Sequence, residues 1–294
     1  MVRLMAMLDI FDWFTIPLQD WLEPVDRFLA QNRSFTKNVI AWPVDKVLDG
    51  FQDFLLMIPD SVLVIAFVLI AIWAAGWRVA LFTGLALLTC GYLEIWNELL
   101  ITLSIVLTAV FFCIIIGIPL GIIASRSDAF AAGIRPILDI MQTTPAFVYL
   151  LPVVILFSIG NTPGVIVTFI FAIPPLIRLT NLGIRQVDSE VIEAALAFGS
   201  SPREVLTKVQ IPLSLPTIMA GVNQTIMLAL SMVVIASLIG AGGLGQLVFE
   251  GINTIDLPLG TLGGIGIVLI AMILDRVTQG LGEKGPGAHQ RSSS

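Results

Sequence analysis

Charged residues are scarce in this chain, and their scarcity excludes an ordinary soluble protein. Only 12% of the 294 residues are charged, whereas 57% are hydrophobic, and the mean hydropathy is +0.97. Soluble domains carry about 25% charged residues. The composition therefore predicts a membrane protein rather than the soluble domains that the length alone would favour.

Residues suited to catalysis or metal binding are also few. The single histidine, His289, lies in a polar tail, which argues against a histidine-based active site or metal centre. Cys90 and Cys113 lie in apolar segments, where packing is the expected role, and two cysteines make neither a disulfide framework nor a metal cluster. None of the four lysines ends a Gly-x-x-x-x-Gly-Lys phosphate loop. We therefore expect a protein that is no enzyme and binds no cofactor of its own.

Two further absences narrow the function and the targeting. No basic patch with interleaved aromatic residues indicates a nucleic-acid partner. Residues 1–14 are interrupted by Asp9 and Asp12 and lack the apolar core of a cleavable signal peptide, so we expect the membrane spans to direct insertion. Nine of the 21 acidic residues precede residue 61, so the net charge of -6 mostly describes the N-terminal region.

Long runs without charge predict the architecture. A membrane helix needs about 20 mostly apolar residues. The 38-residue run at 140–177 contains a turn at 158–164, so we expect two spans there, whereas the 41-residue run at 209–249 predicts one span followed by a glycine-rich piece. The result is an all-α, polytopic membrane bundle with about seven transmembrane helices. The runs are residues 61–77, 79–93, 99–125, 140–177, 209–249 and 257–274.

The basic residues predict an orientation. If Arg78 is cytoplasmic, alternation of the spans places all ten basic residues after position 60 on the same side. The segments between, with Glu94, Glu98, Glu250 and Asp256, carry no lysine or arginine. The positive-inside rule then predicts a multi-pass membrane protein with its N-terminus outside and its C-terminus inside.

The chain divides into three parts by composition. Residues 1–58 mix aromatic residues with acids and prolines, and Leu48, Phe51 and Leu55 recur at helical spacing. Amphipathic helices on the outer membrane face and a loose extension with one pre-membrane helix are both compatible with this pattern. Residues 59–280 form the predicted transmembrane domain, with a cytoplasmic loop at 183–211, and residues 281–294 form a polar cytoplasmic tail.

The polar stretch at 185–212 is the most informative part of the chain. It predicts a first helix capped at Asp188 or Ser189 and ended by Gly199. The second helix has Ser201 at its N-cap, Pro202 at its first position and Glu204 three residues after the cap, which is a capping box. Pro212 can begin the next membrane helix. Two well-capped helices on the cytoplasmic face indicate a docking surface.

The spacing within this stretch resembles the signature of binding-protein-dependent ABC permeases. Glu193-Ala194-Ala195 is followed after three residues by Gly199 and after nine more by Val209-x-Ile211-Pro212. The family form is Glu-Ala-Ala, three residues, Gly, nine residues, Ile-x-Leu-Pro, so this chain departs from it only by apolar exchanges at Val209 and Ile211. Residues 142–152, 173–186 and 220–236 are similar to the glycine betaine/proline, or quaternary ammonium, permeases of this type I family. The similarity runs from about residue 60 to 280.

This resemblance implies the partners and the function. In that family the permease is a homodimer, each copy receives an ABC ATPase subunit at the Glu-Ala-Ala loop, and an external binding protein delivers the substrate. The expected function is import of a small osmoprotectant such as glycine betaine, proline betaine or choline, with ATP and magnesium bound by the ATPase. Carnitine or trimethylamine N-oxide is the alternative cargo. The expected coupling residues are Glu193, Ala194, Ala195, Gly199, Ser201, Pro202, Val209, Ile211 and Pro212. Glu193 can either pair with a basic residue of the ATPase or cap its own helix.

Residues in two predicted spans are candidates for the translocation path. Asn223, Gln224, Thr225 and Ser231 lie in a run without charge, where polar side chains either line an aqueous path or bond between helices. Thr143, Thr144 and Pro145 break a span beside the path or mark an ordinary proline kink. Phe147 and Tyr149 can offer π-faces to a quaternary ammonium group, although the family assigns the aromatic cage to the binding protein.

Glycines mark two further features. Gly117 and Gly121 have the spacing of closely packed membrane helices, with a kinked span as the competing interpretation. Residues 240–245 form either an outer gate or a flexible loop.

An ion-coupled secondary transporter and a non-transporting membrane scaffold are the competing functions. The first usually carries an intramembrane carboxylate at its ion site, and no acid lies within the runs above. The second would not need the coupling signature.

Overall fold

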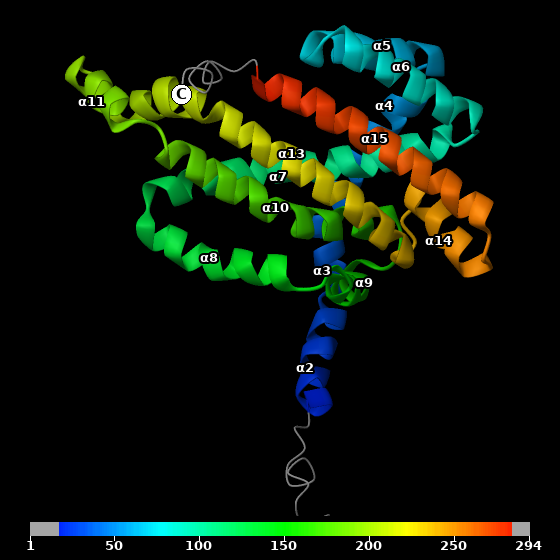
Figure 1. Cartoon of the computed structure of the whole chain (residues 1–294). Coiled ribbons are helices and arrows are strands. Elements are labelled where there is room, and N and C mark those ends of the chain that lie inside the picture. The colour runs from blue at the N-terminus through cyan, green and yellow to red at the C-terminus, as the bar shows by residue number, and fades with distance from the viewer. Residues whose placement is uncertain (1–17, 284–294) are drawn as a thin grey trace, which may run out of the picture.

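The computed structural model describes residues 18–283, which form helices joined by short turns, with no strand among them (Figure 1). Residues 1–14 and His289, which entered the sequence argument, lie outside the described residues. The N-terminal helices are α2 (Leu18–Gln31), α3 (Arg33–Thr36), the π-helix η2 (Lys37–Ala41) and α4 (Trp42–Met57). The remaining helices are α5 (Asp60–Ala75), α6 (Trp77–Tyr92), α7 (Trp96–Arg126), α8 (Asp128–Thr143), η3 (Ala146–Tyr149), α9 (Leu150–Phe157), α10 (Asn161–Arg185), α11 (Ser189–Ala197), α12 (Pro202–Glu204), η4 (Val205–Gln210), α13 (Ile211–Ala236), η5 (Ser237–Ile239), α14 (Leu244–Thr254) and α15 (Leu257–Glu283).

The core is formed where α10 packs along both α7 and α13. Small residues allow the helix backbones to approach closely. A Cβ atom added at Gly121 would lie 2.5 Å from the Cβ of Thr180, and one at Gly183 would lie 2.9 Å from the Cβ of Thr217. The packing interpretation of Gly117 and Gly121 is therefore confirmed, and α7 runs through Pro119 as one helix. Cys90 and Cys113 are buried and unpaired with each other, as a packing role predicts.

Every segment expected to span the membrane is helical, but the segments differ in length. Four helices are long and apolar enough to cross alone: Trp96–Arg126, Asn161–Arg185, Pro202–Ile239 and Leu257–Gly282. Two bent pairs, Arg33–Met57 with Asp60–Ala75 and Asp128–Thr143 with Ala146–Phe157, raise the number to six if each pair is one span. Helix α6 is apolar but shorter than a span, so residues 18–283 contain four to six candidate spans where the sequence predicts about seven. With 16 residues each, α5 and α6 reach only about 24 Å at the standard helical rise.

The basic ends of the helices lie together. Figure 1 shows α11, the start of α8 and the described end of α15 at the same end of the bundle. The α5–α6 turn, which precedes Arg78, also lies there, because a Cβ added at Gly280 of α15 would lie 2.5 Å from the carbonyl oxygen of Ala74. The other end of α5 is held by a 2.7 Å hydrogen bond that the Trp96 indole donates to Asp60. This grouping agrees with the alternation predicted from the arginines.

The described part of the N-terminal region is helical and joins the bundle. In α4, Val44, Leu48 and Leu55 are buried, and the ring of Phe51 lies edge-on to that of Phe111, with 6.2 Å between centroids. Because Phe111 is at the middle of α7, α4 packs against the side of the bundle. Figure 1 shows α2 pointing away from it. Arg33 donates a hydrogen bond to Ser158, and Thr162 donates one to Asp45, so this region is tied to the α9–α10 turn.

Candidate coupling surface and translocation path

Helix α11 forms the first half of the predicted docking surface. Asp188 is its N-cap, since its carboxylate accepts a 2.9 Å hydrogen bond from the backbone N–H of Glu190. This confirms the first of the two caps considered from the sequence. Glu193 is exposed and makes no side-chain hydrogen bond or ion pair within residues 18–283. The capping role falls to Asp188, and the Glu193 carboxylate is left available to a partner.

The turn after α11 depends on Gly199. Its φ of +87° is in the left-handed region, which residues with a side chain disfavour. The turn is closed by backbone hydrogen bonds from Gly199 N–H to the Leu196 carbonyl (2.9 Å) and from Ser200 N–H to the Ala195 carbonyl (3.0 Å). The predicted helix stop at Gly199 is confirmed.

The most exposed apolar side chain of this surface was missed by the sequence analysis. Phe198 is 91% exposed and Leu196 is 47% exposed, next to the exposed Ala194 and Glu193. Phe198 falls among the three variable positions of the family spacing, so only its being the one aromatic residue of the stretch at 185–212 could have marked it. An exposed aromatic residue at the tip of a capped helix has the form of an interface anchor.

The second helix begins with the predicted capping box. The Glu204 N–H donates to the Ser201 hydroxyl (3.3 Å), and the Ser201 N–H donates to the Glu204 carboxylate (3.0 Å). The sequence predicts a short helix separate from the next span, whereas α12, η4 and α13 form one continuous helix. The connection is a π-helical stretch, Val205–Gln210, which ends two residues before Pro212. Its wider turn accommodates a proline that lacks an N–H and crowds the preceding turn.

The continuous helix is too long to lie wholly in a membrane. Its 38 residues extend about 57 Å, whereas the hydrocarbon core is about 30 Å thick. Its charged residues, Arg203, Glu204 and Lys208, all lie in its first turns, so we place this end, beside α11, outside the membrane; α11 contacts η4. The backbone hydrogen bond from Ser201 and the ammonium group of Lys208, 2.9 Å away, lower the pKa of Glu204 to about 2. The carboxylate that completes the cap is thus ionised at every physiological pH.

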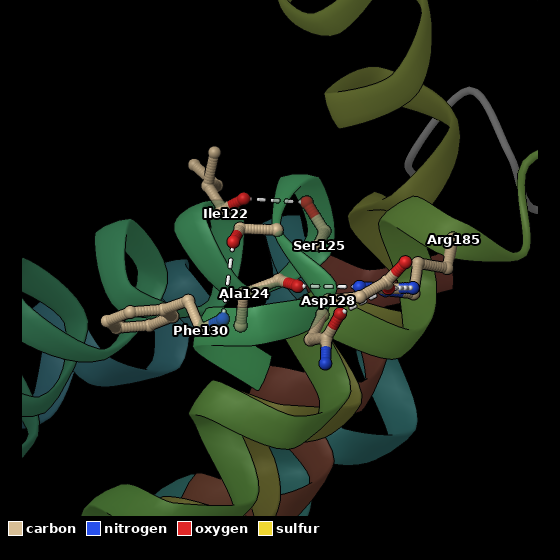
Figure 2. Close-up of polar contacts among 8 residues, drawn as sticks. Ile122, Ala124, Ser125, Asp128, Phe130 and Arg185 are labelled. Atoms are coloured by element: carbon tan, nitrogen blue, oxygen red, sulfur yellow. Dashed lines mark hydrogen bonds and ion pairs between the residues drawn. The ribbon is translucent and has the colours of Figure 1, made fainter. Parts of the chain in front are cut away.

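Arg185 connects the coupling segment to the neighbouring helices (Figure 2). It is the last residue of α10, directly before the turn into α11. Its guanidinium donates 2.7 Å and 2.8 Å hydrogen bonds to the Asp128 carboxylate and the Ala124 carbonyl, and its Nε bonds Asn181 at 2.9 Å. In Figure 2 the Arg185 side chain reaches across to the corner where α7 turns into α8. Ser127 caps α8 at that corner by accepting a 3.2 Å hydrogen bond from Phe130 N–H.

The predicted path residues of α13 divide between two faces. Gln224 and Ser231 are exposed on a stripe that also contains Ala220, Met227 and Leu238. Thr225 is fully buried, and its hydroxyl has no partner among the described residues. Only the exposed pair can therefore face an aqueous path or a second subunit.

Asn223 forms a contact between helices. It donates a 2.9 Å hydrogen bond to Asp275 and accepts a 2.6 Å bond from the Thr278 hydroxyl, both on α15. No acid lies within the charge-free runs of the sequence, but one lies within a helix that is long and apolar enough to span the membrane. Asp275 lies inside α15, one residue after the run at 257–274, and its carboxylate also accepts a 2.6 Å bond from Gln279. Asp275 was missed because the run was ended at the first charge.

The break at Thr144 and Pro145 is a sharp bend. Helices Asp128–Thr143 and Ala146–Phe157 meet at 106°, which is more than an ordinary proline kink. The hydroxyls of Thr143 and Thr144 donate hydrogen bonds within their own helix, to the carbonyls of Asp139 (2.9 Å) and Ile140 (2.7 Å). Phe147 is 61% exposed, whereas the Tyr149 hydroxyl bonds back to the Met141 carbonyl at 2.8 Å. The short helix η3, which carries both rings, contacts α13.

The glycine-rich turn at 240–243 is held in place by hydrogen bonds. Gly242 N–H donates to the Asn161 side chain (2.7 Å), Leu244 N–H to the Thr102 hydroxyl (2.8 Å), and Gly160 N–H to the Ile239 carbonyl (2.9 Å). A Cβ at Gly243 would lie 2.4 Å from the Thr102 hydroxyl. These contacts do not fit the flexible-loop interpretation. They join α7, α10 and α13 at the end opposite the coupling segment.

Comparison with known proteins agrees with this geometry. The model of the family "binding-protein-dependent transport system inner membrane component" matches residues 117–282, a range that contains the whole coupling segment. The glycine betaine/proline betaine transport system permease protein ProW of Escherichia coli (strain K12) is 55% identical over 276 residues, 94% of this chain and 78% of that protein. The glycine betaine/carnitine transport permease protein GbuB of Listeria monocytogenes is 44% identical over 274 residues, 92% of this chain and 97% of that protein.

A solved structure shares the fold. The inward-facing MetNI methionine ABC transporter superposes with a TM-score of 0.57 over 64% of this chain and 95% of the compared chain. With 21% sequence identity, this likeness concerns the fold alone.

Proposed function

Because the chain belongs to the family of binding-protein-dependent transport system inner membrane components, and is therefore a permease subunit of an ABC importer, we propose that it carries glycine betaine, proline betaine or a chemically similar osmolyte. As a multi-pass inner-membrane protein of this family it works with an ATPase subunit and a binding protein. The cargo rests on the 55% identity to a permease named for glycine betaine and proline betaine. Choline, carnitine and trimethylamine N-oxide, which also carry a methylated nitrogen, are the alternative cargoes.

The exposed tip of α11 supports docking of the ATPase at residues 193–212. Glu193, Ala194 and Phe198 are exposed on a capped helix, and α11 also contacts η4, which continues into α13. Displacement of this surface is thereby passed to two membrane helices, α10 and α13. We assign the coupling role to Glu193, Ala194, Ala195, Gly199, Ser201, Pro202, Val209, Ile211 and Pro212, and add Phe198.

The exposed stripe of α13 supports a homodimer around a shared path. Gln224 and Ser231 are polar side chains on an otherwise apolar face. The Ser231 hydroxyl donates a 3.0 Å hydrogen bond to the Met227 carbonyl, so exposure to lipid would be costly chiefly for the Gln224 amide. A second copy facing this stripe would enclose them in an aqueous path. The break at Thr144–Pro145 and the Phe147 ring, carried beside α13 by η3, belong to the same proposed path. Of the earlier candidates, Thr225 and Asn223 are assigned instead to packing between helices.

The substrate is tested by uptake in liposomes that contain this permease, its ATPase and its binding protein. Radiolabelled glycine betaine should accumulate when ATP is enclosed with the ATPase, and unlabelled proline betaine should compete with it. Carnitine, choline and trimethylamine N-oxide provide parallel measurements. Accumulation of one of these three without uptake of glycine betaine would replace the proposed cargo and leave the permease assignment intact.

A further inference from the structure

Two ion pairs connect helix α8 to α10. Leu138 is the only buried residue of α8. A cavity of about 540 Å³ lies between the two helices and is lined by residues of both. Arg185 forms an ion pair with Asp128 at 2.7 Å, and Arg178 forms one with Asp139 at 2.6 Å. The two aspartates are about three turns apart on α8. An ion pair therefore connects α8 to α10 near each of its ends, and Ile134 and Leu138 pack on the core between the two pairs.

These two ion pairs lie between the coupling segment and the bend at Thr144–Pro145. Arg185 is separated from the start of α11 by three residues. Asp139 lies one turn before Thr143, where α8 ends at the 106° bend. Arg185 also holds the carbonyl of Ala124 in α7, so the α7–α8 corner is attached to the same guanidinium.

We propose that Arg185 and Arg178 are positioning residues for transport. By holding Asp128 and Asp139, they make α8 move together with the coupling segment, and this movement repositions the bend at Thr144–Pro145 beside α13. The proposal rests on the function proposed above. In the function proposed above, the movement passes directly along α10 and α13. The ion pairs would pass it to α8 as well.

Exposure argues against a purely stabilising role for these pairs. The side chains of Arg178 and Arg185 are 40% and 39% exposed, and those of Asp139 and Asp128 are 54% and 91% exposed. Exposed ion pairs contribute little to folding stability. Variants that break them should therefore insert and assemble normally, which allows an effect on transport to be measured separately.

The test measures the amount of glycine betaine taken up per ATP hydrolysed by the complete importer in liposomes. Arg185→Gln and Arg178→Asp should each lower this ratio about tenfold, the size of an ordinary coupling effect between sites. The double variant Arg178→Asp/Asp139→Arg should regain most of the wild-type ratio. Arg126→Gln is the matched control, because Arg126 lies at the same corner and its side chain makes no hydrogen bond or ion pair within residues 18–283.

A second measurement does not depend on the cargo. Spin labels at Ala132→Cys and Ser189→Cys, both exposed positions, report the distance between α8 and α11 in the complete importer. This distance should stay the same when ATP is added to the wild type and should change in Arg185→Gln.

The proposal is overturned if Arg185→Gln keeps the wild-type uptake ratio, if the double variant is no better than Arg178→Asp, or if the label distance behaves identically in wild type and variant. Loss of assembly in Arg185→Gln would also overturn it, by showing a structural role. Absence of glycine betaine uptake by the wild type, with normal label behaviour, would instead refute the proposed cargo.

Discussion

At the scale of single residues, Phe198 is the side chain most exposed to a partner on the coupling surface. It is 91% exposed at the end of α11, and burial of an aromatic side chain at an interface centre commonly supplies a large share of the binding energy. Phe198→Ala should weaken binding of the ATPase by about 2 kcal/mol, a factor of about 30. Titration of the ATPase onto the permease in nanodiscs measures this affinity. Phe28→Ala, which removes another exposed aromatic ring, on α2, should leave it unchanged. Equal effects of both substitutions would refute the anchoring role.

Gly199 provides a second prediction at this scale, through its backbone. Nothing lies within 4 Å of an added Cβ, so only the φ of +87° opposes a side chain. Gly199→Ala should destabilise the turn by about 1 kcal/mol, because an alanine disfavours the left-handed region. Gly199→Asn should cost less, because asparagine enters that region more readily. Hydrogen exchange at the amides of residues 198–201 compares the two variants. Equal exchange would show that backbone conformation is not what requires glycine here.

At the scale of helices, the capping box sets where the second half of the coupling segment begins. Ser201→Ala removes the acceptor for the Glu204 N–H and should cost about 1 kcal/mol, or about fivefold faster exchange of the amides at 203–206. Since the pKa of Glu204 is lowered from 4.5 to about 2, the contribution of its carboxylate is complete above about pH 4.5 and is lost as the pH falls towards 2. The effect of Ser201→Ala should therefore be the same at pH 6 and pH 8. Unchanged exchange in this variant would mean that η4 and α13 alone maintain the helix.

Much at this scale could be predicted from the sequence, because the signals are local. The caps at Asp188 and Ser201 and the stop at Gly199 depend on neighbours within four residues. The contact between Asn223 and Asp275 joins positions 52 residues apart, and no local pattern reports such a pair. The packing of Phe51 on Phe111 was missed for the same reason. The continuity of α12 with α13 was missed because Pro212 reads as a helix start unless the π-helical turn before it is known.

At the scale of the whole molecule, the two ends of the bundle should face opposite sides of the membrane. We propose that the end with α11 and the arginines is cytoplasmic and that the end with the glycine-rich turn is external, which places the N-terminus outside and the C-terminus inside. Phe198→Cys should react with a membrane-impermeant maleimide only in inside-out vesicles, and Ile159→Cys, at a position 71% exposed, only in right-side-out vesicles. The native Cys90 and Cys113 are buried and should give little background. Labelling of both positions from the same side would contradict the topology.

The central claim is that ATP hydrolysis by a partner, acting through residues 193–212, drives transport through this chain. The most direct measurement is the initial rate of glycine betaine uptake by liposomes containing the complete importer, with ATP supplied to the ATPase side, compared with the rate under a sodium or proton gradient without ATP. We predict uptake with ATP and none with the ion gradient. Uptake driven by the ion gradient in vesicles that contain no ATPase would contradict the account.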